Sequence, residues 1–367
     1  MTALGDLAQA GVSVWLDDLS RTRLRTGGLR RLVDTRDVVG VTTNPTIFDQ
    51  AISTGDAYAA QLDELARSGA DATAAVRALT TTDVGEACDQ LRDVFEATDG
   101  RDGRVSIEVD PFLAHDATAT LAQARELWAE IDRPNLMIKI PATEEGLAAI
   151  ADATALGISV NVTLIFDVPR YRQVVDAWLT GLQRAQAAGR PLTAIRSVAS
   201  FFVSRVDVEV NRRLERLAVS DDAGLRNTAA LANARVAYQA FTDSLATDRW
   251  RALAAAGAQP QRPLWASTGV KDPLLPDTTY VTGLVAPDTV NTMPERTLEA
   301  VWEHGEVGAE RIPDQMDTAR ATLDRLATAG IDFADVALVL EREGVTKFTD
   351  AWRHLLDTVT QALEARA

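Results

Sequence analysis

One pattern constrains the fold of this chain more than any other: short apolar runs of strand type alternate with amphipathic stretches of helical type. Several runs are rich in Val and Ile, and most do not alternate between apolar and polar residues. Continuous apolar runs of this length indicate strands that are buried on both faces, as in parallel sheets. Eight such runs are predicted, at residues 12–16, 38–42, 105–109, 136–140, 158–164, 194–199, 264–267 and 280–282.

Helical patterns fill the intervals between these runs and continue toward the C-terminus. The stretch after the fourth run has a good helix start, because Thr143 offers a capping hydroxyl and two glutamates follow it in the first turn. The predicted helices within the repeating part lie at residues 58–66, 71–77, 82–97, 117–130, 145–153, 170–188, 204–218, 227–244 and 247–255. Four more are predicted at residues 295–304, 314–329, 333–343 and 345–365.

Eight strand–helix units in one chain favour an α/β fold, a (β/α)8 TIM barrel with additional C-terminal helices. We expect residues 1–367 to form a single barrel domain, with roughly 294–367 as C-terminal helices that pack on it. The alternative from pattern alone is a doubly wound open sheet. No Gly-rich dinucleotide loop follows any of the runs, which weakens that alternative.

The composition argues against several classes of function. A net charge of −16 argues against sequence-independent nucleic-acid binding, which needs dense Lys and Arg on one face. A few local cations still suffice to hold a phosphate group. The single cysteine, Cys88, cannot build a disulfide framework or a cysteine-rich metal site, and the three histidines show no metal-ligand spacing. We therefore expect no metal and no nucleic-acid partner.

The sequence also carries no visible targeting or membrane segment. Residues 1–10 lack a basic region followed by a long apolar stretch, as a signal peptide would have. No run approaches the roughly 18 apolar residues that a membrane span requires. We expect a cytoplasmic protein without a membrane partner.

Polar residues stand where the predicted strands end, which is the edge of a barrel that carries chemistry. Seven of the eight strand ends carry polar or ionisable groups. In chain order these groups are Asp17 and Asp18, Thr42 to Asn44, Glu108 and Asp110, Lys139, Asn161 and Thr163, Ser200 followed by Arg205, and Ser267-Thr268 followed by Lys271.

Lys139 is the most informative of these residues. It lies among aliphatic residues in a predicted strand, and it is one of only three lysines among 37 basic residues. Burial of an unpaired ammonium is costly and tends to lower its pKa, and a neutral amine is a nucleophile for carbonyls. Arginine cannot replace it in that role, because guanidinium keeps its proton. The structural alternative is a buried salt bridge, with Glu108 or Asp17 as the partner.

The neighbouring polar residues allow both kinds of interpretation. Glu108 and Asp17 could simply balance the charge of the lysine, or they could move protons in a Schiff-base aldol reaction. Asn161 and Thr163, on the next strand, can hold sugar hydroxyls without competing for that charge. Asn44 precedes a proline, and Asn-Pro is a common turn signal.

Two long motifs resemble those of a known family. Gly40-Val41-Thr42-Thr43-Asn44-Pro45-Thr46-Ile47-Phe48 resembles the first transaldolase signature, and Ile138-Lys139-Ile140-Pro141-Ala142-Thr143-Glu144-Glu145-Gly146 resembles the second. The order of the two motifs and their separation in the chain also resemble those of the transaldolase family. The resemblance runs from the first predicted strand through Lys271 and is close to the longer transaldolases of actinobacterial type.

The resemblance implies a role for each site residue. It implies that Lys139 forms the imine, that Asp17 is the acid/base in carbon–carbon cleavage, and that Glu108 works through a water on the imine. Two departures stand out: Asp18 is a second carboxylate beside Asp17, and Lys271 lies in a loop where many members offer a second phosphate-binding arginine. The substrate-holding residues implied are Thr42, Asn44, Asn161, Thr163 and Ser200, with Arg205 as one phosphate ligand.

The resemblance also implies the reaction. A dihydroxyacetone unit passes through a lysine Schiff base from a ketose phosphate to an aldose phosphate in the pentose phosphate pathway, with no metal and no organic cofactor. The substrates implied are sedoheptulose 7-phosphate, fructose 6-phosphate, erythrose 4-phosphate and glyceraldehyde 3-phosphate. The alternatives are a class I fructose 6-phosphate aldolase that releases free dihydroxyacetone, or a non-catalytic barrel. Either a monomer or a homodimer is compatible with the sequence.

Overall fold

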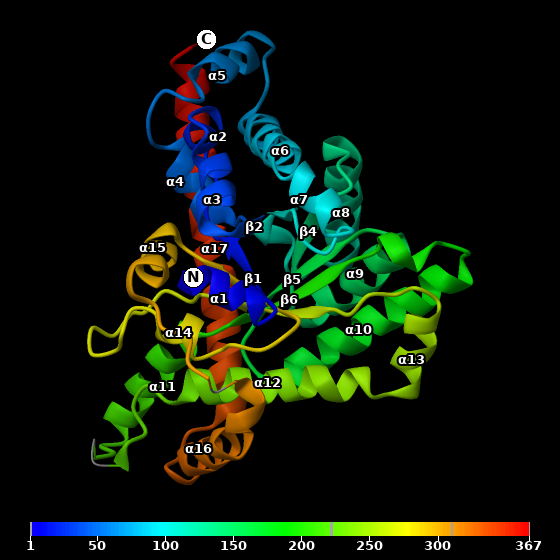
Figure 1. The fold of residues 1–367 in the computed structure, drawn as a ribbon. Coiled ribbons are helices and arrows are strands. Elements are labelled where there is room, and N and C mark those ends of the chain that lie inside the picture. The colour runs from blue at the N-terminus through cyan, green and yellow to red at the C-terminus, as the bar shows by residue number, and fades with distance from the viewer. Residues whose placement is uncertain (1, 221–222, 310, 367) are drawn as a thin grey trace.

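A computed structural model describes residues 2–220, 223–309 and 311–366 of the chain. Within them, eight parallel strands pair in sequence order and close into a barrel (Figure 1). Every residue of these strands except Val39 is buried, because helices cover the outside and side chains fill the inside. The predicted (β/α)8 barrel is confirmed. The strands are β1 (Val12–Leu16), β2 (Val38–Thr42), β3 (Arg104–Glu108), β4 (Leu136–Pro141), β5 (Val160–Ile165), β6 (Ser197–Phe202), β7 (Arg262–Ala266) and β8 (Thr289–Met293).

The predicted eighth strand is wrong. Residues 280–282 lie in a short helix, α14 (Thr279–Thr282), in which the backbone N–H groups of Val281 and Thr282 both donate to the carbonyl of Thr278. The strand that closes the barrel is β8, which pairs with both β1 and β7. Its sequence, Thr-Val-Asn-Thr-Met, is mostly polar, so it does not read as an apolar run. The other seven strands lie where they are predicted, with ends shifted by up to three residues.

Several of the helices begin at a residue whose side chain caps the first turn, among them α8 (Ala117–Ile131), α9 (Glu144–Ala155) and α10 (Val168–Ala187). The hydroxyl of Thr143 accepts a hydrogen bond from the backbone N–H of Gly146, as the predicted helix start requires. The helices of the first seven units are α2 (Arg21–Arg25), α3 (Gly28–Arg36), α4 (Pro45–Ile52), α5 (Ala59–Arg67), α6 (Ala72–Gln90), α7 (Arg92–Ala97), α8 (Ala117–Ile131), α9 (Glu144–Ala155), α10 (Val168–Ala187), α11 (Ser204–Arg216), α12 (Ala229–Leu245) and α13 (Asp248–Ala255).

Two pairs of predicted helices differ from the structure. The stretches predicted at 71–77 and 82–97 are divided near Leu91 instead, into α6 and α7. The stretches predicted at 333–343 and 345–365 form one helix, α17 (Phe333–Glu364). Gly344 does not break α17: it is buried, and a Cβ there would lie 2.8 Å from the side chain of Leu164 in β5. Glycine thus allows the helix to approach the barrel closely.

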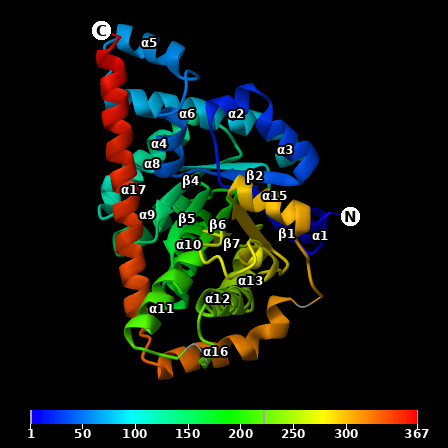
Figure 2. The ribbon, with the colours of Figure 1, turned by 90° about the vertical axis from the view of Figure 1, so that its left-hand side faces the viewer.

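The last helix crosses the mouth of the barrel. α17 packs against β5 and against α4, α11 and the turn η1 (Pro111–Leu113), which follow the carboxyl ends of β2, β6 and β3. Figures 1 and 2 show α17 on the side of the barrel opposite α1 (Ala3–Gln9). Before it, α15 (Glu295–His304) follows β8, and α16 (Met316–Thr328) packs on α12. α17 therefore covers the edge at which the strand-end polar residues meet.

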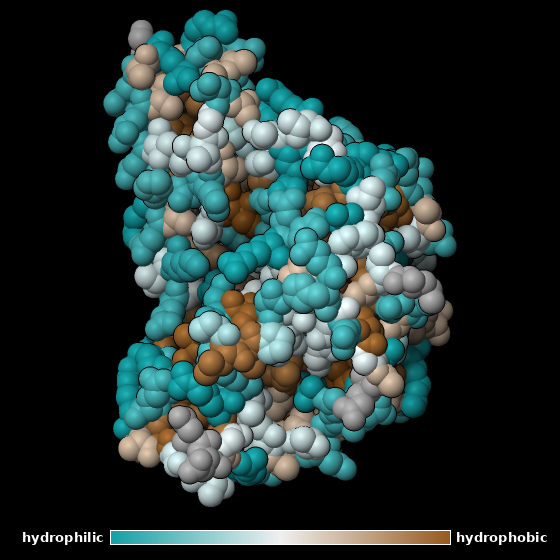
Figure 3. Space-filling view, turned by 60° about the vertical axis from the view of Figure 1, so that its left-hand side comes forward, coloured by the Kyte–Doolittle hydropathy of each residue, from teal (hydrophilic) through white to brown (hydrophobic). Residues whose placement is uncertain are grey.

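The exterior is mainly hydrophilic on the face drawn in Figure 3, with apolar atoms visible in the hollows between polar side chains. Among the described residues, no helix is long and apolar enough to cross a membrane.

A glycine inside the barrel gives a test of the packing. A Cβ on Gly40 in β2 would lie 2.5 Å from ring atoms of Trp15, a fully buried side chain in β1. We expect Gly40→Ala to destabilise the protein by about 1–3 kcal/mol, because the rigid indole has to move within a filled core. Denaturant unfolding measures the change. The matched control is Gly85→Ala in α6, where nothing lies within 4 Å of the added methyl, and which should stabilise by about 0.5–1 kcal/mol. Equal unfolding midpoints for the two variants would contradict the packing described here.

Candidate active site

Lys139 and Glu108 form a buried ion pair at the carboxyl end of the barrel. They are register partners on β4 and β3, and Lys139 Nζ lies 3.1 Å from Glu108 Oε2 with the two side chains 5% and 2% exposed. Lys139 Nζ also donates a hydrogen bond of 3.0 Å to the backbone carbonyl of Thr43, just beyond β2. The amine is thus held from two sides by groups that the sequence places at adjacent strand ends.

Asp17 and Asp18 form contacts with different residues. Asp17 follows β1 and accepts a 2.6 Å hydrogen bond from the hydroxyl of Thr42, which lies 2.7 Å from the hydroxyl of Thr292 in β8. Asp18 borders the same surface pocket as Asp17 but pairs with Arg23 at 2.5 Å. Of the two carboxylates, Asp17 is therefore the one that lies near Lys139, whose charge acts on it.

Burial makes both carboxylates near Lys139 reluctant to ionise. It raises the pKa of Asp17 and of Glu108, and the positive charge of Lys139 opposes the increase in each case. Apart from this ion pair, the Glu108 oxygens have no hydrogen-bond partner among the described residues. Two carboxyl groups with raised pKa values therefore lie beside one amine, an arrangement suited to acid/base work.

A chain of neutral side chains lines the neighbouring strands. Ser200 Oγ donates to Asn161 Oδ1 at 2.7 Å, and Asn161 Nδ2 donates to Ser106 Oγ at 3.0 Å. Asn161 is the register partner of Lys139. The Thr163 hydroxyl is buried without a hydrogen-bond partner in the described part of the chain. Ser106 was not predicted as a site residue, since it lies inside β3 rather than at its end.

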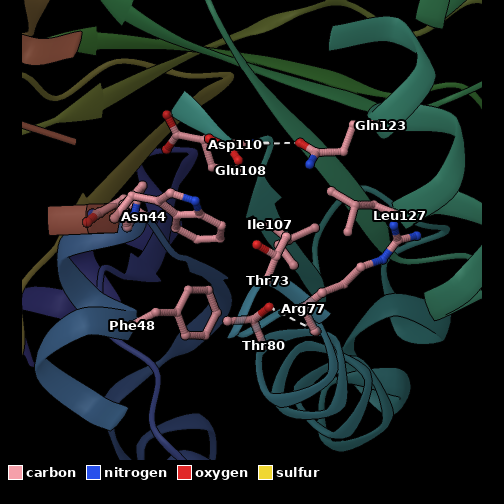
Figure 4. Close-up of a pocket in the computed structure, with 12 residues that line it drawn as sticks. Asn44, Phe48, Thr73, Arg77, Thr80, Ile107, Glu108, Asp110, Gln123 and Leu127 are labelled. Atoms are coloured by element: carbon pink, nitrogen blue, oxygen red, sulfur yellow. Dashed lines mark hydrogen bonds between the residues drawn. The ribbon is translucent and has the colours of Figure 1, made fainter. Parts of the chain in front are cut away.

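Asn44 has a structural role that its Asn-Pro motif predicts. Its side-chain oxygen accepts a hydrogen bond from the backbone N–H of Ile47 and caps α4. Asn44 and Glu108 also border a small cavity of about 70 Å³. Asp110 lies beside Glu108 in this cavity (Figure 4). Trp352 of α17 lines the same cavity, so the C-terminal helix reaches the surroundings of Glu108.

Three cations surround the mouth. Arg205 on α11 lies with its guanidinium 5.1 Å from the ring centre of Phe202, and burial lowers its pKa, while the charges of Asp17, Glu343 and Glu108 oppose that change. Lys271 lies in the loop after β7. Neither residue forms an ion pair within the described residues.

The third cation, Lys347 on α17, was not predicted from the sequence. Desolvation lowers its pKa, and the positive charges of Arg205 and Lys271 lower it further, so both of these cations lie close enough to act on Lys347. The next residue, Phe348, is buried with its ring centre 5.8 Å from Lys139 Nζ. Because the chain has only three lysines among 37 basic residues, Lys347 could have been singled out from the sequence. The sequence pattern did not predict that α17 lies over the mouth of the barrel.

A barrel with a buried lysine and two carboxylates at its mouth has the parts of an enzyme that uses an amine nucleophile on carbonyl substrates. The family model for transaldolase/fructose-6-phosphate aldolase matches residues 14–359. The chain therefore belongs to the transaldolase/fructose-6-phosphate aldolase family, and the resemblance noted in the sequence is confirmed.

Individual relatives agree over nearly the whole chain. The chain is 59% identical to a transaldolase of Thermobifida fusca (strain YX) over 362 residues, which cover 99% of this chain and 98% of the relative. It is 60% identical to a transaldolase of Acidothermus cellulolyticus over 361 residues, 98% of this chain and 97% of the relative. A transaldolase of Mycolicibacterium smegmatis is 58% identical over 99% of this chain and 98% of its own length.

Proposed function

We propose that Lys139 carries out the transaldolase reaction of this chain, with Glu108 and Asp17 moving the protons. The chain is a transferase that acts on sugar phosphates, as its family and its full-length transaldolase relatives indicate. The observation that supports the residue assignment best is the buried contact of Lys139 with Glu108 at 3.1 Å, beside a carboxyl group with a raised pKa at Asp17.

Imine formation is the first step of the proposed mechanism. Glu108 first takes a proton from the ammonium of Lys139, and the neutral amine then attacks the keto carbon of a ketose phosphate, such as fructose 6-phosphate or sedoheptulose 7-phosphate. The carbinolamine hydroxyl then leaves as water, for which Glu108 supplies a proton, either directly or through a bridging water. The product is a protonated imine, whose positive charge replaces that of the ammonium beside Glu108.

Carbon–carbon cleavage is the second step. Asp17 takes the proton from the hydroxyl on the carbon next to the breaking bond, and the bond electrons move into the protonated imine to give an enamine. An aldose phosphate leaves, and an acceptor such as erythrose 4-phosphate or glyceraldehyde 3-phosphate takes the three-carbon unit by the reverse sequence. The electron sink is the imine, so the step requires no metal and no organic cofactor.

The polar groups around the lysine are proposed to hold the substrate. Asn161 and Ser200 lie in one hydrogen-bonded chain beside Lys139, and the free hydroxyl of Thr163 is available to a bound sugar or water. Thr42 holds Asp17 in place through its 2.6 Å hydrogen bond. Asn44 keeps its side-chain N–H groups available because only its oxygen caps α4.

We assign the phosphate end of the substrate to Arg205, Lys271 and Lys347. Lys347→Met should raise KM for fructose 6-phosphate about 10–100-fold, the effect of losing one hydrogen bond between charged groups, with a smaller change in kcat. Initial rates with fructose 6-phosphate and with free dihydroxyacetone as donors measure the difference, and Arg205→Ala should behave alike. The matched control is Arg342→Met, an exposed cation elsewhere on α17. An equal effect of Lys347→Met on both donors would exclude a phosphate contact.

The family description also covers fructose-6-phosphate aldolases, which leaves one competing function. Incubation of the protein with fructose 6-phosphate, with and without erythrose 4-phosphate, separates the two by following glyceraldehyde 3-phosphate. Product that depends on the acceptor supports the transferase, and equal product without it supports the aldolase. A cytoplasmic location, and the choice between monomer and homodimer, stay predictions.

A further inference from the structure

A second cavity lies at the opposite end of the barrel from Lys139. It has a volume of about 300 Å³ and is bordered by the amino-terminal residues of three strands, Arg104 of β3, Ser197 of β6 and Arg262 of β7. Along β3, Arg104 and Glu108 are four residues apart, which corresponds to about 13 Å. The two sites therefore use different ends of the same strands.

Arginines dominate this cavity, although the protein as a whole is acidic. Arg101, Arg104, Arg196 and Arg262 all line it. Two of them have carboxylate partners: Arg262 pairs with the buried Asp102 at 2.9 Å, and Arg101 pairs with Asp288 at 2.9 Å. For Arg104 and Arg196, the described residues provide no carboxylate within ion-pair distance. Arg104 and Arg196 thus line the cavity without an ion-pair partner among the described residues. The lining carries four arginines against one carboxylate, Asp99, whose charge acts on Arg196.

Arg104 is the strongest sign that the cavity is built for an anion. Its residue is 1% exposed, and its Nη1 atom has no hydrogen-bond partner among the described residues. Its Nε donates a 2.7 Å hydrogen bond to the carbonyl of Gly100, and the guanidinium lies 5.3 Å from the ring centre of Phe95. The side chain is therefore fixed in place while part of its hydrogen-bonding capacity is unused, which is rare for a buried polar group.

The electrostatics of Arg104 agree with that interpretation. Burial lowers its pKa to about 9, and the charges of Arg196 and Arg262 contribute to the decrease. Burial also lowers the pKa of Arg196, and the charge of Arg262 adds to the effect while that of Asp99 opposes it. A bound anion would relieve this repulsion, since it interacts favourably with every one of these guanidinium groups.

We propose that this cavity, lined by Arg104, Arg196 and Arg262, binds a phosphate group, free or as the monoester of a small hydroxylated compound. The planar guanidinium group of arginine can donate two parallel hydrogen bonds to the oxygens of a phosphate group. Arg196 is held by the backbone carbonyls of Thr193, Ile195 and Asp99, which leaves its charge available to a ligand. Gln259 also lines the cavity and offers an amide group to the rest of an ester, whereas the hydroxyls of Thr98 and Ser197 donate to the backbone carbonyls of Val94 and Val160.

The test removes the mouth site first, because phosphate also fits there. In a background that carries both Arg205→Ala and Lys347→Met, calorimetric titration with inorganic phosphate should detect one remaining site, and adding Arg196→Gln should weaken it at least ten-fold. Adding Arg190→Gln, an exposed arginine that does not line the cavity, should leave the affinity unchanged. Melting temperatures check that every variant is folded.

A second titration uses glycerol 3-phosphate, which has no carbonyl and cannot form an imine. Tighter binding than inorganic phosphate, with the same loss in the Arg196→Gln variant, assigns the cavity to a phosphate monoester, and equal binding assigns it to free phosphate. The proposal fails if the protein with Arg205→Ala and Lys347→Met binds neither compound, or if adding Arg196→Gln and adding Arg190→Gln give the same affinity.

Discussion

The Lys139→Arg variant should fold normally and lose about 10⁴-fold or more of its turnover, as enzymes do when the nucleophile is removed. Arginine retains a positive charge that can pair with Glu108, so the buried charge balance survives. It cannot become a neutral nucleophile, because guanidinium keeps its proton at any accessible pH. The variant therefore separates the charge of Lys139 from its chemistry. Circular dichroism and a thermal melt confirm the fold, and the coupled assay gives the rate.

A chemical trap identifies the same residue directly. Borohydride added during incubation with fructose 6-phosphate should reduce the imine to a stable secondary amine, and the modified peptide should be the one that contains Lys139. Only two other lysines exist, Lys271 and Lys347, so the peptide map is unambiguous. Labelling at either of those residues, or full activity without any labelling, would overturn the mechanism.

Loss of either carboxylate should slow a different step. Positioned acid/base groups contribute about 10²–10⁴-fold to rate, and we expect a loss in this range for both Glu108→Gln and Asp17→Asn. Glu108→Gln should slow imine formation, since the carboxyl group next to the amine is removed. Asp17→Asn should still form the imine but cleave it slowly, so the trapped adduct should accumulate. Borohydride trapping at timed intervals distinguishes the two variants.

Asp18→Asn is the control for the second prediction. Asp18 pairs with Arg23 and is partly exposed, so its loss should leave the rate of cleavage close to that of the unmodified protein. If Asp18→Asn proves inactive while Asp17→Asn is normal, the acid/base role belongs to the neighbouring residue instead.

Local sequence patterns predicted seven strands because each of these is an apolar run between helices. β8 escaped this reasoning because its Thr and Asn residues are buried through specific contacts: the Asn291 side chain donates to the carbonyl of Tyr280, and Thr292 contacts Thr42. Such contacts come from the closed barrel and not from the segment itself. Residues 280–282 were wrongly predicted as a strand, because their backbone N–H groups form local hydrogen bonds within a short helix.

The expectation that polar residues at strand ends meet at one edge of the barrel also explains which of the candidate site residues could be predicted. Glu108 and Asp17 lie at or just beyond the carboxyl ends of their strands, which parallel strands bring to one edge. Lys139 and Asn161 lie inside their strands and come beside Glu108 through the register of β3, β4 and β5. Lys347 lies on a helix that is far away in sequence, and only its packing across the barrel brings it to Arg205 and Lys271. No periodicity within α17 specifies the surface on which the helix lies.

The position of α17 has a consequence for the order in which the protein becomes competent during synthesis. All eight strands have been made once Met293 is added, whereas Lys347 and Phe348 follow on the last helix. At roughly 5–20 residues per second, translation of that interval takes seconds. All the strands that carry Lys139, Glu108 and Asp17 are therefore synthesised before the helix that covers the mouth, and the proposed substrate site becomes complete only when α17 has been made.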